Sequence, residues 1–361
     1  MRPHTPRLTV IFAALTLSTG AAHAQTTAPA SPACATATPL GVSRIVEIDT
    51  STGALFGAIS RQAKEPRFLE PKEVILTFDD GPMPAVTRNI LDTLDQFCTK
   101  ATFFQVGQMA IAYPATVKSI LSRGHTIGTH TWSHPMNLKH LPREKAIDEI
   151  EKGFAAVTLA AGQPIAPFFR FPGLSDSAPL LAHLQERGIA SFTVDAVSDD
   201  SYISDPQRLL QHALAEVEAQ KGGIVLFHDI KPATARMLPH FLSELRARGY
   251  HIVHMIPKSH VEPLAIQSQH LLPLLEKTQK AAAANPLLPF YGALKPSVET
   301  DDAPRAEAVV TAIAPAPRDR AANPHPVKID KPKSLAATSL VGHSTNEPTK
   351  TAVQGWLKRT D

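Results

Sequence analysis

Apolar positions follow two different periods along the middle of the chain. Short apolar runs rich in β-branched and aromatic residues recur between segments in which apolar residues return every three or four positions. The runs predict strands at residues 74–78, 101–106, 126–129, 168–171, 190–194, 224–227 and 251–254, with a further short strand at 44–48. The periodic segments predict helices at residues 87–94, 115–122, 143–159, 178–187, 206–219, 235–248 and 264–284.

Strands that alternate with helices indicate right-handed βαβ units around a parallel sheet. Seven such strands fall within residues 72–257, a segment shorter than the about 250 residues of a complete eight-unit barrel. We therefore expect an α/β fold in the form of a distorted, incomplete (β/α)7 barrel with parallel strands. A disordered C-terminal tail is expected to follow it.

The first residues have the three parts of a secretory signal. Arg2 and Arg7 precede an apolar stretch at residues 8–17, and Ala22-His23-Ala24 offers a small-x-small cleavage pattern. The apolar stretch is shorter than the about 20 residues that a membrane span needs. We expect cleavage near Ala24 and a periplasmic or secreted protein without a stable membrane span.

The alternation of strands and helices also divides the remaining chain. Residues 25–71 are expected to form a mostly irregular arm, and residues 72–257 the main domain. Residues 258–284 are expected to add a helical extension. Residues 285–361 are rich in Ala and Pro without an apolar period, so they are expected to be disordered.

Composition excludes several classes of protein. The 361 residues include 36 Lys+Arg and 33 Asp+Glu, and the net charge of +3 is too small to indicate a nucleic-acid binder. Two cysteines exclude a Cys₄ zinc module and a disulfide-dense mini-protein. In an exported protein, Cys34 and Cys98 could form a bridge or remain two free thiols, and the sequence leaves both open. Nothing in the sequence predicts a protein partner.

Two adjacent carboxylates end the first strand of the main domain. Asp79 and Asp80 are followed by Gly81 and Pro82, which end the strand sharply. One interpretation is a metal-ligating carboxylate beside an acid/base carboxylate, because neighbouring negative charges need a compensating cation. The alternative is an Asx-type turn that caps the next helix.

Two histidines follow the strand at residues 126–129. His130 and His134 are four residues apart, which would place them on one face of a helical turn, and neutral imidazoles suit zinc. The alternative is a pair of surface histidines. With Asp80 they would supply three ligands and leave a fourth position open, the arrangement of a catalytic zinc site.

Two further polar residues lie at strand ends. Arg170 could pair with Asp79 or point to solvent, and His228 could donate a proton or serve as a core histidine. The segment at residues 173–177 approaches a nucleophile elbow but lacks its closing glycine, so we reject serine-hydrolase chemistry.

Taken in order, these clusters resemble the polysaccharide deacetylase family, also called the NodB-homology domain or carbohydrate esterase family 4. The resemblance covers about residues 72–257. It rests on five motifs: TFDDGP at 77–82, H-x-x-S-H at 130–134, R-x-P at 170–172, an Asp-containing stretch at 195–202 and L-x-H at 226–228.

The resemblance implies a role for each of these residues. Asp80, His130 and His134 would hold one divalent metal, with zinc expected first and Co²⁺ or Ni²⁺ as alternatives. The catalytic roles would be those of Asp79 as general base, Arg170 as the residue that orients Asp79, and His228 as general acid. Asp195, Asp199 and Asp200 are candidates to pair with His228, and Asp200 aligns best. Pro172 and the amide of Gly173 would contact the substrate and the oxyanion.

Two positions depart from the family's pattern. Gly173 stands where the family usually has tyrosine, and Ser201 then Tyr202 stand where tryptophan usually follows the aspartate. Both changes remove aromatic surface that would pack against the acetyl group and the sugar.

We expect an exported, metal-dependent hydrolase that removes N-acetyl or similar small N-acyl groups from an amino-sugar polysaccharide. Peptidoglycan, a chitin-like chain and an exopolysaccharide remain open as substrates. One alternative is a hydrolase of another small amide or of a formyl sugar on the same scaffold. Another is a non-catalytic glycan-binding protein, which would predict damage to the metal triad or to Asp79, and the sequence retains all four residues.

Overall fold

The computed structural model describes residues 39–284, which belong to one compact unit. The strands of this part are β1 (Arg44–Ile48), β2 (Leu55–Phe56), β3 (Glu73–Asp79), β4 (Thr102–Gln105), β5 (Thr126–Thr129), β6 (Phe168–Phe169), β7 (Ala190–Phe192), β8 (Ala196–Val197), β9 (Gly223–His228) and β10 (His251–Pro257). The helices are α1 (Pro84–Gln96), α2 (Gly107–Ala112), α3 (Pro114–Ser122), α4 (Arg143–Ala161), α5 (Ala178–Arg187), α6 (Pro206–Ala219), α7 (Pro232–Ala247) and α8 (Ala265–Ala284).

The expected signal peptide and C-terminal tail lie outside the described residues. Cys98 is disulfide-bonded, and Cys34, the only other cysteine of the sequence, also lies outside them.

Every strand pairing in residues 39–284 is parallel, which confirms the predicted α/β class. The main row runs β1-β10-β3-β4-β5-β6-β7-β2, and β9 pairs with β3. β8 follows β7 after three residues and pairs with β9, whereas β7 pairs with β6. The continuous segment 190–197 therefore pairs with β6 through β7 and with β9 through β8. The distorted barrel itself stays a prediction.

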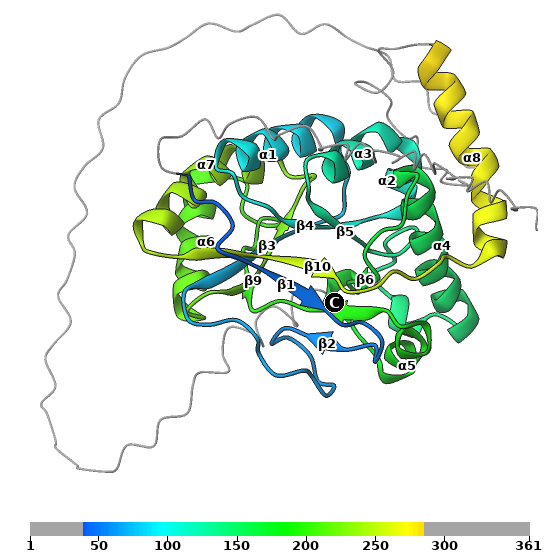
Figure 1. The fold of residues 1–361 in the computed structure, drawn as a ribbon, viewed down its shortest axis with the longest axis horizontal. Coiled ribbons are helices and arrows are strands. Elements are labelled where there is room, and N and C mark those ends of the chain that lie inside the picture. The colour runs from blue at the N-terminus through cyan, green and yellow to red at the C-terminus, as the bar shows by residue number, and fades with distance from the viewer. Residues whose placement is uncertain (1–38, 285–361) are drawn as a thin grey trace, which may run out of the picture. The chain divides into compact units, whose positions relative to one another are not determined.

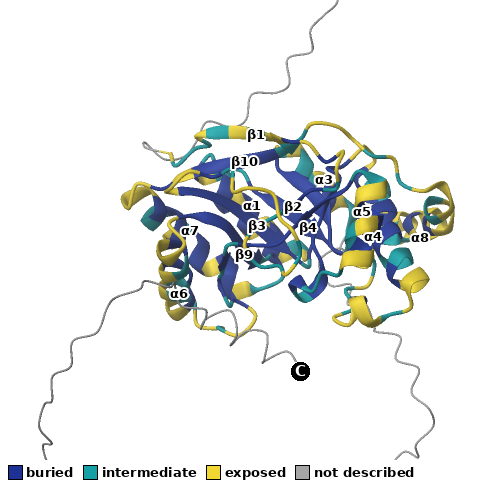
Figure 2. Ribbon diagram, turned by 90° about the horizontal axis from the view of Figure 1, so that it is seen from below, coloured by how far each residue is buried: buried dark blue, intermediate teal, exposed yellow. Residues whose placement is uncertain are grey.

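Helices surround the strands in the arrangement that βαβ units produce (Figure 1). Apart from β1, which is largely exposed or half-buried, the strands form the dark-blue interior of Figure 2. The outward faces of helices such as α4 and α6 are exposed. All seven residues of β3 are buried. Such a strand is apolar along its length because both of its faces are buried, so it can be recognised in the sequence. The predicted strands and helices are found close to their expected bounds.

Stacked phenylalanines hold the strands that lead to the polar clusters. The ring of Phe78 on β3 lies 5.1 Å from that of Phe103 on β4 and 5.8 Å from that of Phe227 on β9. Fully burying each such side chain stabilises the fold by about 1.5–3 kcal/mol. The ends of these three neighbouring strands are therefore fixed relative to one another.

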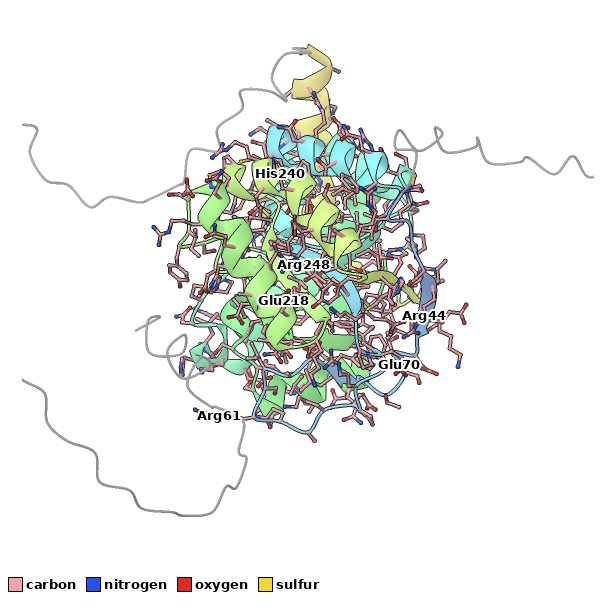
Figure 3. The ribbon with its side chains drawn as sticks, turned by 90° about the vertical axis from the view of Figure 1, so that its left-hand side faces the viewer. Arg44, Arg61, Glu70, Glu218, His240 and Arg248 are labelled. Atoms are coloured by element: carbon pink, nitrogen blue, oxygen red, sulfur yellow. The ribbon has the colours of Figure 1, made fainter. Side chains whose placement is uncertain are left out.

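Ion pairs tie several elements together at the surface. Arg248, directly after α7, pairs with Glu218 on α6, and Figure 3 shows the two side chains close together. Arg44 on β1 pairs with Glu73 on β3, with 2.6 Å between Nη2 and Oε2. An exposed pair such as Arg248–Glu218 typically contributes up to about 1 kcal/mol, so it supports the fold without determining it. Glu73 is buried, and Arg44 binds both of its carboxylate oxygens, so the second pair also satisfies a buried charge.

The expected helical extension is present as α8, which packs on α4 and α2 through Leu271 and Leu275. None of the helices within residues 39–284 has the length and apolarity that crossing a membrane would require.

Candidate active site

The polar residues singled out above gather at one edge of the sheet. Asp79 and His228 are the last residues of β3 and β9, two strands paired in register so that these residues are partners. His130 and Arg170 directly follow β5 and β6. Since the carboxyl ends of parallel strands meet on one face, four chain segments deliver their functional side chains to one place.

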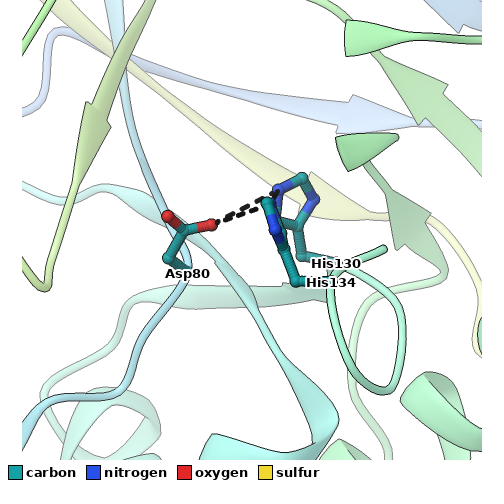
Figure 4. Close-up of side chains that lie close together, drawn as sticks. All are labelled: Asp80, His130 and His134. Carbon is teal, nitrogen blue, oxygen red and sulfur yellow. Dashed lines mark hydrogen bonds and ion pairs between the residues drawn. The ribbon is translucent and has the colours of Figure 1, made fainter. Parts of the chain in front are cut away.

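Asp80, His130 and His134 form a cluster of potential metal ligands (Figure 4). Oδ1 of Asp80 lies 3.2 Å from Nε2 of His134 and 3.6 Å from Nε2 of His130. The two Nε2 atoms are 3.1 Å apart, and one ligand atom from each residue lies within 4.8 Å of the others. Three side chains from two strand ends therefore point at one position.

The chemistry of these three residues fits a divalent metal. Nδ1 of His130 lies 2.7 Å from the carbonyl oxygen of Arg170, so Nδ1 carries the proton and Nε2 presents its lone pair to the cluster. Burial lowers the pKa of His130 well below its ordinary value and keeps the ring neutral. Oδ1 of Asp80 is buried without a hydrogen-bond partner. Two imidazole nitrogens and one carboxylate oxygen are the donor set of a catalytic zinc site with an open position.

The two histidines do not lie on a helical turn, so that expectation is wrong. Residues 132–133 form a bend and their neighbours have no regular structure, and both Thr131 (φ 67°) and His134 (φ 60°) have left-handed backbone. The hydroxyl of Thr131 accepts a hydrogen bond from the amide of His134, and Ser133 donates both its amide and its hydroxyl to Glu149 on α4. Local bonds between side chains and backbone, rather than helical periodicity, bring the imidazoles together.

Arg170 is fully buried and faces Asp79, so the solvent-directed alternative is wrong. Its Nη1 lies 2.7 Å from Oδ1 of Asp79 and 2.8 Å from Oγ1 of Thr77. Its guanidinium carbon lies 4.2 Å from the ring centre of Phe104, and its Nε donates to the carbonyl of Phe192. These contacts fix the guanidinium and leave Oδ2 of Asp79 facing the cluster.

Two opposing effects determine the pKa of Asp79. Burial raises its pKa, the charge of Arg170 lowers it, and the net result is a pKa of about 6. The carboxylate is therefore mostly ionised at neutral pH but more basic than an ordinary aspartate, which suits a general base.

The alternative of a helix cap is also wrong, because Met83 occupies the N-cap of α1 and no side chain caps that helix.

His228 is paired with Asp200. Its Nδ1 lies 2.6 Å from Oδ1 of Asp200, and its backbone amide donates to Oδ2. Burial alone would lower the pKa of His228, but the Asp200 carboxylate raises it to about 9. Of the other two candidates, Asp195 accepts the amide of Ile224 and Asp199 pairs with His212. The structure thus places Asp200, and neither of the others, against His228.

The segment after β6 leaves little room for a side chain at residue 173. Gly173 has φ 59° within the 3₁₀ turn Pro172–Leu174, and an added Cβ would lie 2.8 Å from Cε of Met136. Met136 itself is 54% exposed, as is Tyr202 at 60%. A methionine from the β5–α4 connection thus occupies the space beside Gly173.

One buried carboxylate in this region was given no role by the sequence analysis. Asp229 directly follows His228, is 0% exposed and binds the backbone of the turn after β3. Burial raises its pKa to about 7. Only its position next to His228 could have drawn attention to it, because its contacts depend on the pairing of β9 with β3.

Comparison with known proteins gives a consistent result. The polysaccharide deacetylase family model matches residues 68–192. The chain is 34% identical over 205 residues to a peptidoglycan-N-acetylglucosamine deacetylase of Listeria monocytogenes, covering 57% of this chain and 42% of that protein. It is 31% identical over 187 residues to a peptidoglycan-N-acetylglucosamine deacetylase of Bacillus cereus, covering 50% of this chain and 85% of that one.

Among solved structures, the fold is similar to that of a peptidoglycan deacetylase of Bdellovibrio bacteriovorus. The TM-score is 0.54 at 34% identity, and the match covers 60% of this chain and 59% of that one. The chain thus spans less than half of the Listeria relative and just under three-fifths of the Bdellovibrio chain.

Proposed function

Because this chain belongs to the polysaccharide deacetylase family, we propose that it is an exported, metal-dependent hydrolase that removes N-acetyl groups from an amino-sugar polysaccharide. One observation carries the proposal: Asp79, held by Arg170, and His228, held by Asp200, both border the cluster of Asp80, His130 and His134. Oδ2 of Asp79 lies 3.8 Å from Nε2 of His130, and Nε2 of His228 lies 3.8 Å from Oδ2 of Asp80. The sequence of residues 1–24 supports export.

The substrate we favour is the N-acetylglucosamine of peptidoglycan. The printed names of the Listeria and Bacillus relatives specify that sugar in that polymer. A chitin-like chain or an exopolysaccharide carries the same acetamido group, so the proposed chemistry would be identical.

Asp80, His130 and His134 would hold the metal. When bound there, zinc, or Co²⁺ or Ni²⁺ in its place, would supply Lewis-acid activation of water and of the amide carbonyl. The neutral ring of His130 and the free Oδ1 of Asp80 are prepared for that role by the contacts described above.

Asp79 would act as general base. Arg170 binds its Oδ1, so Oδ2 is the oxygen left to accept a proton from the attacking water. Arg170 also keeps the carboxylate charged in a fully buried position, where an unpaired charge would be costly.

His228 would act as general acid. Asp200 accepts a hydrogen bond from the Nδ1–H of His228. The Nε2–H is therefore directed toward the metal-ligand cluster. As the amide C–N bond breaks, this proton passes to the leaving nitrogen, and the products are acetate and the free amino sugar. The backbone amide of Gly173, next to Pro172, would donate to the oxyanion.

A panel of acylated substrates tests this proposal. Mature protein loaded with zinc is incubated with peptidoglycan, chitin oligomers and a formylated amino sugar, and released acetate, formate and free amine are quantified. Acetate and amine in equal amounts from peptidoglycan are expected. Formate alone would overturn the assignment in favour of a formyl-sugar hydrolase, and binding of glycans without any release would indicate a non-catalytic protein.

A further inference from the structure

Asp229 is a buried carboxylate for which the proposed chemistry has no use. It is 0% exposed, and it separates His228 from the connection to α7. A buried carboxylate persists only where hydrogen bonds satisfy it, because the cost of removing it from water is large. The bonds described below join Asp229 to the segment that carries Asp80 and to the first turn of α1.

The contacts of Asp229 lie on both sides of Asp80. Its backbone amide donates to the carbonyl oxygen of Asp79 at 3.2 Å, and its Oδ1 accepts the amide of Gly81 at 2.9 Å. Asp229, the residue directly after β9, therefore binds the backbone on both sides of Asp80, a candidate metal ligand.

A second set of bonds continues from the other carboxylate oxygen. Oδ2 of Asp229 accepts the hydroxyl of Thr87 on α1 at 2.7 Å. The same hydroxyl oxygen accepts the amide of Met83 at 2.9 Å. The turn from Asp79 to Met83 is thus attached to β9 at its start and to the first turn of α1 at its end.

Asp80 needs such support because its backbone is strained. Its φ is 75°, in the left-handed region that non-glycine residues seldom adopt. Such a residue costs about 1–3 kcal/mol and persists only where its surroundings dictate the conformation. Without this φ, the carboxylate of Asp80 would leave the chain in another direction.

Gly81 allows Asp229 to approach. A Cβ at residue 81 would lie 2.1 Å from Oδ2 and 2.2 Å from Oδ1 of Asp229. The carboxylate therefore occupies the space that any other residue at position 81 would fill. The Asp229 carboxylate can bind here only because residue 81 has no side chain.

We propose that Asp229 is a positioning residue that holds Asp80 in its left-handed conformation, so that the Asp80 carboxylate faces His130 and His134. The inference rests on the proposed metal site and assigns Asp229 no contact with substrate. It predicts that zinc affinity depends on the Asp229 acceptor oxygen that binds Gly81.

Zinc affinity, measured by chelator competition in the absence of substrate, tests the inference. Removing an outer partner of a metal ligand typically weakens affinity about 10–100-fold, and we expect this loss for Asp229→Ala. Asp229→Asn keeps an oxygen for the Gly81 amide and should recover affinity to within about threefold of wild type. Asp195→Ala is the matched control, because the Asp195 carboxylate also accepts one backbone amide, that of Ile224 on β9, which lies outside the turn that carries Asp80.

Wild-type zinc affinity in folded Asp229→Ala would overturn the inference. If that variant fails to fold, Gly81→Ala replaces it, since the added Cβ would displace the Asp229 carboxylate and should weaken zinc binding by a similar factor. Unchanged affinity in Gly81→Ala would equally refute the assignment. Zinc-loaded wild type that releases no acetate from any substrate would refute the proposed function. If Asp229→Ala still weakens zinc binding in that case, the positioning role stands, so the two failures are distinct.

Discussion

Nδ1 of His228 lies 2.6 Å from Oδ1 of Asp200, and this pair keeps a partly buried imidazole charged. Asp79 and Asp80 add attraction from the other side of the ring. The carboxylates outweigh the effect of burial, so the pKa of His228 rises to about 9. A proposed general acid must hold its proton at working pH, and this pair meets that requirement.

The pH dependence of kcat/KM should therefore be bell-shaped. Activity should fall below about pH 6, where Asp79 gains a proton, and above about pH 9, where His228 loses one. Asp200→Asn should move the alkaline limb to lower pH, because it removes the largest contribution that favours the charged ring. An alkaline limb unchanged by Asp200→Asn would show that another group titrates there.

Arg170→Met should destabilise the protein, because it leaves Asp79 buried without its guanidinium partner. Breaking a buried ion pair on one side typically costs about 3–5 kcal/mol of unfolding free energy. The loss should be larger at pH 7 than at pH 4, since Asp79 can become neutral at the lower pH. Urea unfolding of wild type, Arg170→Met and the double variant Asp79→Asn/Arg170→Met measures this, and the double variant should regain part of the loss. A loss in Arg170→Met that is equal at both pH values would contradict the pairing.

His254 on β10 should contribute stability that rises with pH between about 4 and 6.5. Burial lowers the pKa of this imidazole from 6.5 to about 4, so in this interval the unfolded chain binds a proton that the folded protein excludes. The contribution lost at pH 4 is about 3 kcal/mol, and it is fully restored above pH 6.5.

His254→Gln should remove this contribution, since glutamine can still bond to Thr126 but does not titrate. The measurement is the difference between the urea midpoints of wild type and variant at pH 4.5, 5.5 and 7. Burial raises the pKa values of Asp79 and Asp229 and lowers that of His125, and these groups contribute equally in both proteins. A slope identical to that of wild type would assign the effect to other groups.

Met136→Ala should raise KM more than it lowers kcat, because an exposed methionine beside Gly173, the proposed oxyanion donor, would contact the sugar or its acyl group in both ground and transition states. Loss of such an apolar contact is worth about 1–3 kcal/mol, or roughly a 5- to 160-fold change in kcat/KM. Leu272→Ala on α8, 44% exposed, is the control for removal of surface apolar area. Equal kinetics for Met136→Ala and Leu272→Ala would remove Met136 from the substrate site.

Local patterns in the sequence were sufficient to predict the strands and therefore the edge at which the site lies. Asp79 and His228 could be placed there because each ends an apolar run, and parallel strands end on the same face. The short α2 and β8 were missed, since six and two residues are too few to display a period.

What the sequence could not provide depends on contacts between distant segments. Asp195, Asp199 and Asp200 lie within six residues, and only the pairing of β8 with β9 decides which of them meets His228. The spacing of His130 and His134 suggested a helix, but the actual bends follow from hydrogen bonds of Thr131 and Ser133 that propensity alone does not reveal.

The most direct test of the central claim is zinc titration of metal-free protein with acetate release as the readout. Wild type should release acetate from peptidoglycan in proportion to bound zinc, up to one equivalent per chain. Asp79→Asn should bind the same equivalent and release almost none, because the proposed base is lost while the ligands Asp80, His130 and His134 remain. Acetate release by metal-free wild type, or by zinc-loaded Asp79→Asn at the wild-type rate, would contradict the account.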